Sequence, residues 1–279
     1  MFKRAYVEIT NVCNLRCDFC PGTKRAGRFL PPEAFRVLAK KLRPHASYLY
    51  LHVMGEPLLH PQLEDILQIA AELRFRVCIT TNGTLLAEKA PILLSSPALY
   101  KLSVSLHSAE GSGAGDLTDY LSAVWDSAVP ISRAGTICVL RLWNIGGADA
   151  RNGEIFSFLE SRLGVPPLSC PRPRPGSWRL GEKLYLEQAE RFDWPDLHAP
   201  ETGTAFCLGL RDQLAVLADG TVVPCCLDHE GDIPLGNLLE QDLEDILNAP
   251  RARAVYEGFS RGRPPEPLCR RCGYARRFG

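Results

Sequence analysis

Five short runs in the first 165 residues alternate apolar with other side chains, at the period of two that is typical of β-strands. The stretches between them have helical character. Pro32 is typical of a first helical turn, and residues 63–70 repeat apolar side chains at i, i+3, i+4 and i+7. This alternation predicts parallel strands joined by crossover helices. The predicted strands are 5–10, 48–54, 76–81, 101–107 and 136–143, and the helices are 32–42, 63–70, 85–95, 117–128 and 154–163.

The two faces of each predicted strand differ in character. In the second strand one face carries Leu49 and Leu51, whereas the other carries Tyr50 and His52. A tightly packed barrel interior would be dominated by bulky branched residues. An open parallel sheet would be covered by helices on both faces, which makes a plain sheet with one wet face the weaker alternative. The pattern favours a partial barrel whose polar inner wall holds ligands, with a sixth strand at 180–187.

The last third of the chain has a different organisation. A proline-rich stretch at 164–175 predicts a loop, and residues 191–206 read as a linker. Asp219-Gly220 is a strong turn signal between the predicted strands 213–217 and 221–224, and helices are expected at 239–247 and 250–259. We therefore predict an α/β protein. A partial (β/α)6 barrel spans 1–190, a linker 191–206, and a small β-hairpin/helix domain 207–279.

Length and charge restrict the function. A chain of 279 residues suits one barrel-like domain with a small appendage. Lys plus Arg and Asp plus Glu balance at 32 each, so no bulk attraction to a nucleic-acid polymer or a membrane follows. We expect neither as a partner. The apolar runs are far shorter than the roughly 18 residues of a membrane span, and a signal peptide is lacking, which predicts a cytoplasmic protein.

The eleven cysteines carry more information than the bulk composition. In a reducing cytosol such a number indicates metal ligation rather than disulfides. Cys78 and Cys138 lie in apolar strand patterns and are expected to be core residues. The cysteines gather in two groups, three near the start of the chain and five between residues 207 and 272.

The first group follows the first strand as C-x3-C-x2-C. Iron–sulfur clusters are held by cysteine thiolates, and a four-iron cluster held by Cys13, Cys17 and Cys20 would keep one iron open to a substrate or cofactor. A zinc site that lacks one ligand, or unrelated core cysteines, are the alternatives from spacing alone.

With Phe19 just before the last cysteine, this motif resembles that of the radical S-adenosylmethionine (SAM) superfamily. The resemblance implies a partial TIM-like barrel. It also implies that the open iron chelates the amino and carboxylate groups of SAM. An electron from the [4Fe–4S] cluster then cleaves a C–S bond of SAM, and the resulting 5′-deoxyadenosyl radical abstracts hydrogen from a substrate. Cys13, Cys17 and Cys20 are thus the implied catalytic and metal-binding residues.

Further residues resemble the SAM contacts of this superfamily. The run Gly55-Glu56-Pro57 is similar to its GGEP-type motif, which grips the SAM amino group, although Met54 stands where a glycine is commoner. Short polar side chains at strand ends suit ribose hydroxyls and carboxylates, and barrel active sites gather at that end. The residues that the resemblance implies there are Thr80, Asn82, Ser105, His107 and Arg141.

Three of these residues keep alternatives. Asn82 with Gly83 also fits a plain turn. His107 is equally compatible with a substrate contact, a proton donor or a satisfied polar core residue. Arg141 either meets the SAM carboxylate or pairs with Glu8.

The second cysteine group is compatible with a zinc ribbon by composition. Its pattern, from CLGL through DGTVVPCC to LCRRC, resembles the SPASM/twitch extension of radical SAM enzymes. Five cysteines suit one auxiliary [4Fe–4S] cluster, and full ligation suits electron transfer better than substrate binding. The expected ligands are Cys207, Cys225, Cys269 and Cys272, with Cys226 as a spare that alternatively replaces Cys225.

The resemblance implies a radical SAM enzyme, an oxidoreductase or lyase, served by an external donor of the flavodoxin or ferredoxin type. Only 12 residues precede Cys13, which leaves no room there for a peptide-binding domain and favours a small-molecule substrate. The outcome after hydrogen abstraction is oxidation, bond cleavage or rearrangement. The runs VEITNVCNL, RLWN and GYARRF weakly resemble queuine lyases, which points to a nucleobase such as queuine. A peptide-modifying enzyme and a non-enzymatic zinc or iron–sulfur scaffold are the rival hypotheses.

Overall fold

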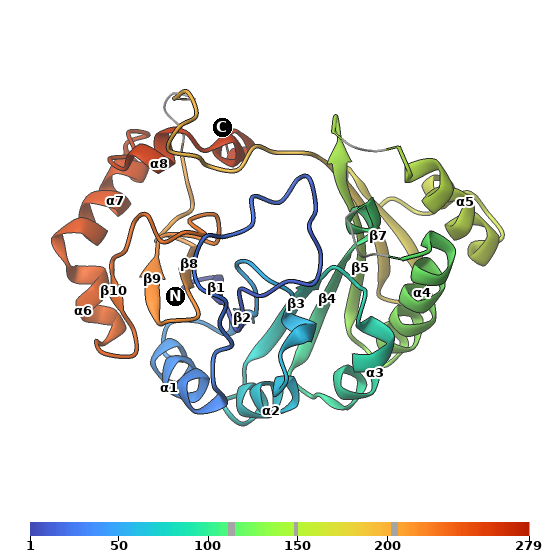
Figure 1. Ribbon diagram of the computed structural model, residues 1–279, viewed down its shortest axis with the longest axis horizontal. Helices are drawn as coiled ribbons and strands as arrows, with labels where there is room; N and C mark the ends of the chain where they lie inside the picture. Colours follow the sequence, from blue (N-terminus) through green and yellow to red (C-terminus); the bar gives the residue numbers. More distant parts are fainter. Residues whose placement is uncertain (111–114, 148–149, 202–205, 279) are drawn as a thin grey trace.

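The computed structural model describes residues 1–110, 115–147, 150–201 and 206–278, and its central feature is one ten-stranded sheet. The strands are β1 (Arg4–Val7), β2 (Tyr48–Tyr50), β3 (Arg76–Thr81), β4 (Leu99–Ser105), β5 (Ile137–Ile145), β6 (Ser177–Gly181), β7 (Leu184–Glu190), β8 (Gln213–Val216), β9 (Thr221–Val223) and β10 (Gly236–Asn237). Their order is β10-β9-β8-β1-β2-β3-β4-β5-β7-β6, so β10 and β6 form the two edges. The sheet curves without closing (Figure 1).

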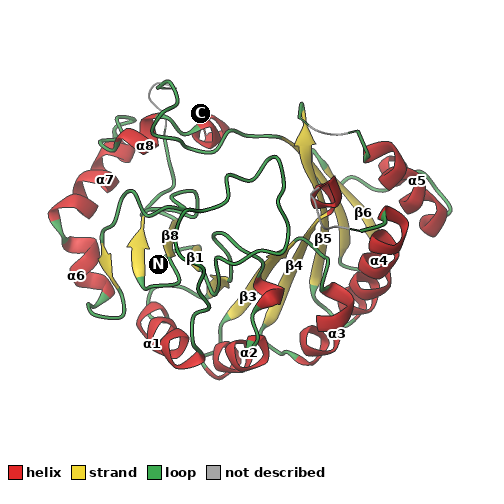
Figure 2. Cartoon of the chain, in the orientation of Figure 1, coloured by secondary structure: helices red, strands yellow, loops and turns green. Residues whose placement is uncertain are grey.

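Neighbouring strands pair in parallel from β1 to β5, and β5 pairs in parallel with β7. Figures 1 and 2 show the helices on the outside of the curved sheet. They are α1 (Pro32–Leu42), α2 (Leu63–Glu72), α3 (Leu86–Ser95), α4 (Leu117–Arg133), α5 (Asn152–Leu163), α6 (Leu243–Asn248), α7 (Pro250–Ser260) and α8 (Pro267–Arg270). This arrangement confirms the predicted partial barrel. Within the described ranges, none of the helices has both the length and the apolar character needed to cross a membrane.

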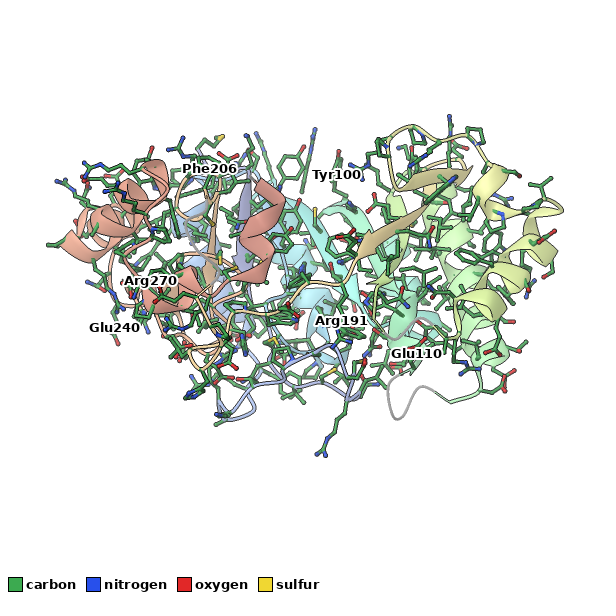
Figure 3. The ribbon with its side chains drawn as sticks, turned by 90° about the horizontal axis from the view of Figure 1, so that it is seen from above. Tyr100, Glu110, Arg191, Phe206, Glu240 and Arg270 are labelled. Carbon is green, nitrogen blue, oxygen red and sulfur yellow. The ribbon has the colours of Figure 1, made fainter. Side chains whose placement is uncertain are left out.

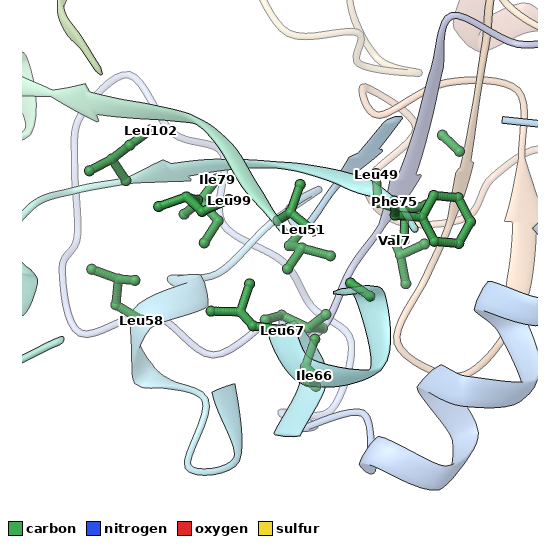
Figure 4. Close-up of a cluster of buried hydrophobic side chains, with 14 of the residues drawn as sticks. Val7, Leu49, Leu51, Leu58, Ile66, Leu67, Phe75, Ile79, Leu99 and Leu102 are labelled. Atoms are coloured by element: carbon green, nitrogen blue, oxygen red, sulfur yellow. The ribbon is translucent and has the colours of Figure 1, made fainter. Parts of the chain in front are cut away.

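The hydrophobic core lies between the sheet and the outer helices. Leu49 and Ile79 point from β2 and β3 towards Ile66 and Leu67 of α2 (Figure 4). These side chains are almost fully buried, and each contributes about 1.5–3 kcal/mol relative to its exposed state. The period of two therefore placed the apolar face of each strand correctly. Cys78 and Cys138 are also buried, as expected for core cysteines.

Several strand ends differ from the sequence pattern: the first strand already ends at Val7, and the fifth continues to Ile145. The fourth strand ends at Ser105, and His107 lies in the 3₁₀ turn η2 (Leu106–Glu110). The second strand ends at Tyr50, and further along the backbone N–H of Met54 donates to the Glu8 carboxylate.

The sixth strand also differs from the pattern, because residues 177–190 form two strands instead of one. β6 and β7 are antiparallel, and β7 provides the parallel neighbour of β5. Lys183 in the turn between them has φ of 51°, a left-handed conformation that a strand pattern does not reveal.

The predicted C-terminal hairpin is present as β8 and β9, which are antiparallel. Gly220 in its turn has φ of 89°, and an added Cβ there would lie 2.4 Å from Asn237 Oδ1, so glycine is required. Unexpectedly, β8 also pairs in parallel with β1 over four residues. The hairpin thus continues the barrel sheet, and the division at residues 190 and 207 stays a prediction.

Glu8 joins three parts of this fold. Its carboxylate is fully buried and accepts two hydrogen bonds of 2.7 Å from the Arg25 guanidinium. It also accepts from the backbone N–H groups of Met54, at 3.1 Å, and of Ala218, at 3.0 Å. Arg25 additionally donates from Nε to the carbonyl of His229 at 2.8 Å. One carboxylate thereby connects the loop after β1, the loop after β2 and the C-terminal hairpin.

We expect Arg25→Ala to lower the free energy of unfolding by about 3–5 kcal/mol, because it leaves a buried carboxylate without its cation. The matched control is Arg36→Ala, which breaks an ion pair with Glu72 whose side chains are 40% and 43% exposed, and should cost under about 1 kcal/mol. Urea denaturation of the three proteins measures both changes. Equal losses in the two variants would contradict the role of the Glu8–Arg25 pair.

Candidate active site

The first three cysteines lie in the loop between β1 and α1, which crosses the inner side of the curved sheet (Figure 1). Cys13 is exposed, whereas Cys17 and Cys20 are half-buried. Burial, followed by the neighbouring Cys20 and Cys13 thiols, raises the pKa of Cys17 to about 11. Burial also raises the pKa of Cys13 and of Cys20. The three sulfurs are therefore close enough to influence one another's charge.

Hydrogen-bond donors surround these sulfurs. Cys13 Sγ accepts from the Leu15 N–H at 3.5 Å and from Asn82 Nδ2 at 3.9 Å. Ser108 contributes a hydrogen bond to Cys17. Donors of this kind stabilise thiolates and tune the potentials of iron–sulfur clusters, so the donor set fits a cluster. In the part of the chain that the structure describes, no group of three or more His, Cys, Asp or Glu side chains is positioned to hold a single metal ion.

The Gly55-Glu56-Pro57 motif packs against the start of the cysteine loop. Gly55 has φ of 75°, and an added Cβ would lie 2.4 Å from the Thr10 carbonyl oxygen. The N–H of Glu56 donates to the carbonyl of Val12 at 2.8 Å. Glycine is thus required here by sterics, because the two loops approach at backbone distance. The contact places this motif against Val12, the residue that precedes Cys13.

The Glu56 side chain is engaged by the protein itself. It is 1% exposed and accepts from the N–H of Leu58, the hydroxyl of Thr81 and the N–H of Asn82, at 2.7–2.9 Å. Burial raises its pKa to about 7, against the opposing effect of these donors. Its carboxylate therefore ties the motif to the end of β3, and the contact of the motif with the SAM ammonium stays a prediction.

Asn82 lies next to Cys13, as expected for a residue of the SAM site. Its Nδ2 donates to Asn14 Oδ1 at 2.9 Å, and Asn14 belongs to the cysteine loop. Its Oδ1 accepts from the N–H and hydroxyl of Thr84, so the Asn82-Gly83 pair also forms a turn. The turn interpretation of Asn82 is confirmed, and its contact with SAM stays a prediction.

The remaining predicted contacts lie on β3, β4 and β5 and in the turn after β4. Ser105 is the register partner of Arg141, and Thr80 is that of Ser103. His107 is 5% exposed, its Nδ1 lies 3.1 Å from the Arg141 carbonyl, and its ring stacks on Phe19 at 4.6 Å. Burial lowers the pKa of His107 to about 4, so the ring is neutral. Its visible contacts support the cysteine loop, and its direct role stays a prediction.

The suggested ion pair between Arg141 and Glu8 is wrong. Both Glu8 oxygens bind Arg25 instead. The Arg141 guanidinium lies over the ring of Trp143, 3.6 Å from its centroid. The cation–π contact holds Arg141 on the inner face of the sheet.

Several residues of the site escaped the sequence analysis. They are the Asn14, Thr81 and Ser108 described above and Tyr120, whose hydroxyl donates to the Asn82 carbonyl at 2.7 Å. Thr81 and Ser108 adjoin predicted residues, so the motifs TTNG and SLHS contained the signal. Tyr120 lies on α4 and carried no signal, because its partner is distant in sequence.

The second cysteine group surrounds one pocket. Cys207, Cys225, Cys269 and Cys272 all line it, together with apolar side chains such as Phe259. The pKa of Cys225 is raised well above its ordinary value by burial and by neighbouring cysteines. Backbone donors serve the set: the Gly209 N–H lies 3.4 Å from Cys207 Sγ, and the Ala275 N–H donates to Cys272. A pocket of sulfur ligands in an apolar wall fits a buried cluster.

Cys226 is directed elsewhere. It packs with Tyr6, Val53 and Met54 on the inner face of the sheet, and it shares a hydrogen bond with the Tyr6 side chain. It does not line the pocket of the other four cysteines. The two cysteines follow β9 in a bend and a turn, and their side chains enter different surroundings. This geometry supports the ligand set without Cys226.

The comparisons with known proteins agree with this geometry. The family model described as the radical SAM superfamily matches residues 7–113, and that of an iron–sulfur cluster-binding domain, SPASM, matches residues 207–273. A probable GTP 3′,8-cyclase from Methanocella arvoryzae is 34% identical over 277 residues, which cover 86% of this chain and 87% of the relative. The sporulation killing factor maturation protein SkfB from Bacillus subtilis is 24% identical, over 86% of this chain and 63% of its own length.

Solved structures show the same fold. The crystal structure of BtrN with AdoMet and 2-DOIA matches with a TM-score of 0.63 and 20% identity, and covers 98% of this chain and 93% of that one. Streptococcus suis SuiB bound to its precursor peptide SuiA matches with a TM-score of 0.61 and 17% identity, over 98% and 70% of the two chains. The chain spans less than two thirds of the length of several curated relatives, SkfB among them.

The chain belongs to the radical SAM superfamily and carries a SPASM iron–sulfur cluster-binding domain. Membership makes it an enzyme that uses SAM and a [4Fe–4S] cluster, and the SPASM domain adds an auxiliary iron–sulfur cluster.

Replacing Cys225 and Cys226 separately tests the ligand set. Two four-iron clusters give about eight irons per chain. Anaerobically reconstituted Cys226→Ala should keep about eight irons, whereas Cys225→Ala should fall towards about four, because only Cys225 faces the pocket. Iron and sulfide analysis measures both. Loss of iron in the Cys226 variant alone would assign the ligand to Cys226.

Proposed function

We propose that this chain reductively cleaves SAM at the cluster of Cys13, Cys17 and Cys20 and abstracts hydrogen from a small-molecule substrate. The observation that carries the proposal is the position of the cysteine loop. Hydrogen bonds from Asn82 and backbone contacts with Gly55-Glu56 hold it at the C-terminal ends of parallel strands, where barrel active sites gather. When SAM and the cluster are bound, they supply the 5′-deoxyadenosyl radical that abstracts hydrogen from the substrate.

The protein's own residues then have the following roles in the proposal. The cysteine thiols must lose their protons to bind iron, and burial makes them weak acids, so cluster assembly should release protons. The loop of Gly55, Glu56 and Pro57 offers carbonyls to the SAM ammonium. In the proposal, polar side chains contact the ribose and the carboxylate of SAM. They belong to Thr80, Asn82, Ser105, His107 and Arg141.

A small-molecule substrate is supported by two kinds of relative. Probable GTP 3′,8-cyclases from two archaea are 34% and 33% identical over at least 86% of this chain, and the BtrN structure contains 2-DOIA. Oxidation, bond cleavage and rearrangement all begin with the same hydrogen abstraction, and a nucleobase such as queuine remains our specific candidate. The resemblance to SkfB and to peptide-bound SuiB supports peptide modification as the second candidate function.

The reaction also needs electrons from another protein. A single-electron donor of the flavodoxin or ferredoxin type is the proposed partner of the cluster, and Cys13 of the cysteine loop is exposed. Free thiols throughout the described chain fit a reducing compartment, so we place the protein in the cytoplasm.

Cys17→Ala should abolish the formation of 5′-deoxyadenosine, because the SAM-binding cluster loses a ligand. The assay is chromatography of anaerobic, dithionite-reduced reactions with SAM. Undiminished formation in this variant would remove the proposed mechanism.

Cys272→Ala is the matched variant in the other cysteine group. It should spare part of the SAM cleavage in the absence of substrate, because its thiol lies in the SPASM pocket, away from the SAM loop. Cleavage as low as in Cys17→Ala would show that the two sites do not act separately.

A further inference from the structure

The segment that follows β7 contacts both cysteine groups. We call its residues 191–201 the strap, and they extend from β7 towards α8 (Figure 1). The first residue of the strap is bound to the sheet, because the Arg191 N–H donates to the Ile145 carbonyl of β5 at 2.9 Å. The Arg191 side chain also passes close to Gly147, where an added Cβ would lie 2.6 Å from Arg191 Cδ. The end of β5 therefore restricts where this side chain can lie.

The Arg191 guanidinium holds the cysteine loop at two points. Its Nη1 lies 3.2 Å from Asp18 Oδ2, and its Nη2 donates to the Asp18 carbonyl at 3.2 Å. Asp18 directly follows Cys17 and stands two residues before Cys20. The contact with the carbonyl fixes the backbone between these two cysteines, which a contact with the carboxylate alone would not do. The Arg191 and Asp18 side chains are 35% and 54% exposed, so the ion pair adds little to global stability and its effect is local.

The other end of the strap is bound by the turn that joins the last two cysteines of the chain. Arg271 Nε donates to the Ala199 carbonyl at 2.8 Å, and Arg271 Nη1 lies 3.3 Å from the Glu201 carboxylate. Arg270, which is labelled in Figure 3, donates to the same carboxylate at 3.0 Å. The two arginines of the C-R-R-C motif thus join this end of the strap to a turn that carries two predicted cluster ligands.

The middle of the strap forms part of the SPASM pocket. Pro195 lines this pocket together with the four cysteines. The backbone of Asp193 approaches Gly273, the residue after the predicted ligand Cys272, and an added Cβ at Gly273 would lie 2.8 Å from the Asp193 carbonyl oxygen. Glycine is therefore required there, because the strap and the ligand turn meet at backbone distance. A filled pocket would restrict the wall to which the strap is attached.

Trp194 adds an apolar contact between the two cysteine groups. Its side chain packs against a buried apolar cluster on the inner face of the sheet, and Cys20 and Cys226 pack against the same cluster. The Trp194 ring also contacts His229 edge-on at 5.4 Å. The strap is thus held at both ends and in the middle, and one of its ends lies on the cysteine loop.

We propose that the strap couples the two cluster sites, and that Arg191 is the positioning residue through which a filled SPASM pocket orders the cysteine loop. In this scheme the filled pocket fixes the turn of the last two cysteines and, through it, the strap. The Arg191 contact then restricts the backbone between Cys17 and Cys20. The inference goes beyond the proposed function, because it gives the auxiliary cluster an effect on loop order that is separate from electron transfer. Coupling of this kind acts in both directions.

Hydrogen exchange of the cysteine loop, measured by mass spectrometry without SAM, tests the coupling. The parent protein is the full chain with Cys13→Ala, Cys17→Ala and Cys20→Ala, in which only the SPASM pocket keeps its predicted ligands. Anaerobic reconstitution should give about four irons per chain. It should slow the exchange of residues 14–20 roughly two- to fivefold, the effect expected when one exposed ion pair becomes ordered.

Arg191→Ala in the parent should remove most of this slowing, and Arg191→Lys should restore part of it, because Lys keeps the charge but lacks the two-point fork. The matched control is Arg162→Ala, which breaks an ion pair with Asp126 whose side chains are 37% and 65% exposed, and it should exchange like the parent. Urea denaturation should give the parent, Arg191→Ala and Arg162→Ala similar midpoints, which shows that any difference in exchange is local.

Three results would overturn the inference. They are reconstitution of the parent without iron uptake, iron uptake without slower exchange of residues 14–20, and equal slowing in the parent and in Arg191→Ala. Because the experiment contains no SAM, none of these results bears on SAM cleavage, whose own test is the Cys17→Ala assay.

Discussion

The buried ion pair between Glu8 and Arg25 is the interaction on which the site depends. A carboxylate without contact with water is costly unless every oxygen is satisfied, and Glu8 meets this condition with four donors. Those donors come from the cysteine loop, the loop that precedes Gly55 and the C-terminal hairpin. The same carboxylate therefore fixes the loop of the SAM cysteines relative to both neighbours. In addition, Arg191 of the linker (labelled in Figure 3) pairs with Asp18 of that loop at 3.2 Å.

Much of the barrel could be predicted from local patterns. Each parallel strand has an apolar face because outer helices cover it. Residues such as Leu49 and Ile79 therefore identify both the strand and the face that it buries. The pairing of β8 with β1 could not be predicted. The four residues of β8 are all buried, and nothing in their pattern indicates which strand lies beside them. Likewise, the β6–β7 hairpin turns at Lys183, a residue without turn preference.

The candidate site, like the fold, has features that local sequence patterns predict and features that they do not. The two predicted ligand sets follow from the resemblance of the cysteine patterns to known motifs, because spacing alone is also compatible with zinc sites. The partner of Glu8 was mistaken, since Arg25 lies in a loop whose path no periodicity describes, whereas Arg141 lies on a predictable strand. Nor does spacing separate Cys225 from Cys226. Only the packing of Cys226 against Tyr6 shows which sulfur faces the inner wall.

The place of β1 in the sheet has a consequence for biosynthesis. One of its two neighbours, β8, is made about two hundred residues after it. Until then its backbone donors and acceptors on that edge stay unpaired, a state that invites association with other chains. Such a long wait for a non-local partner also slows folding. The nascent chain therefore acquires the β1–β8 pair only after β8 has been made, and chaperone protection matters most before that moment.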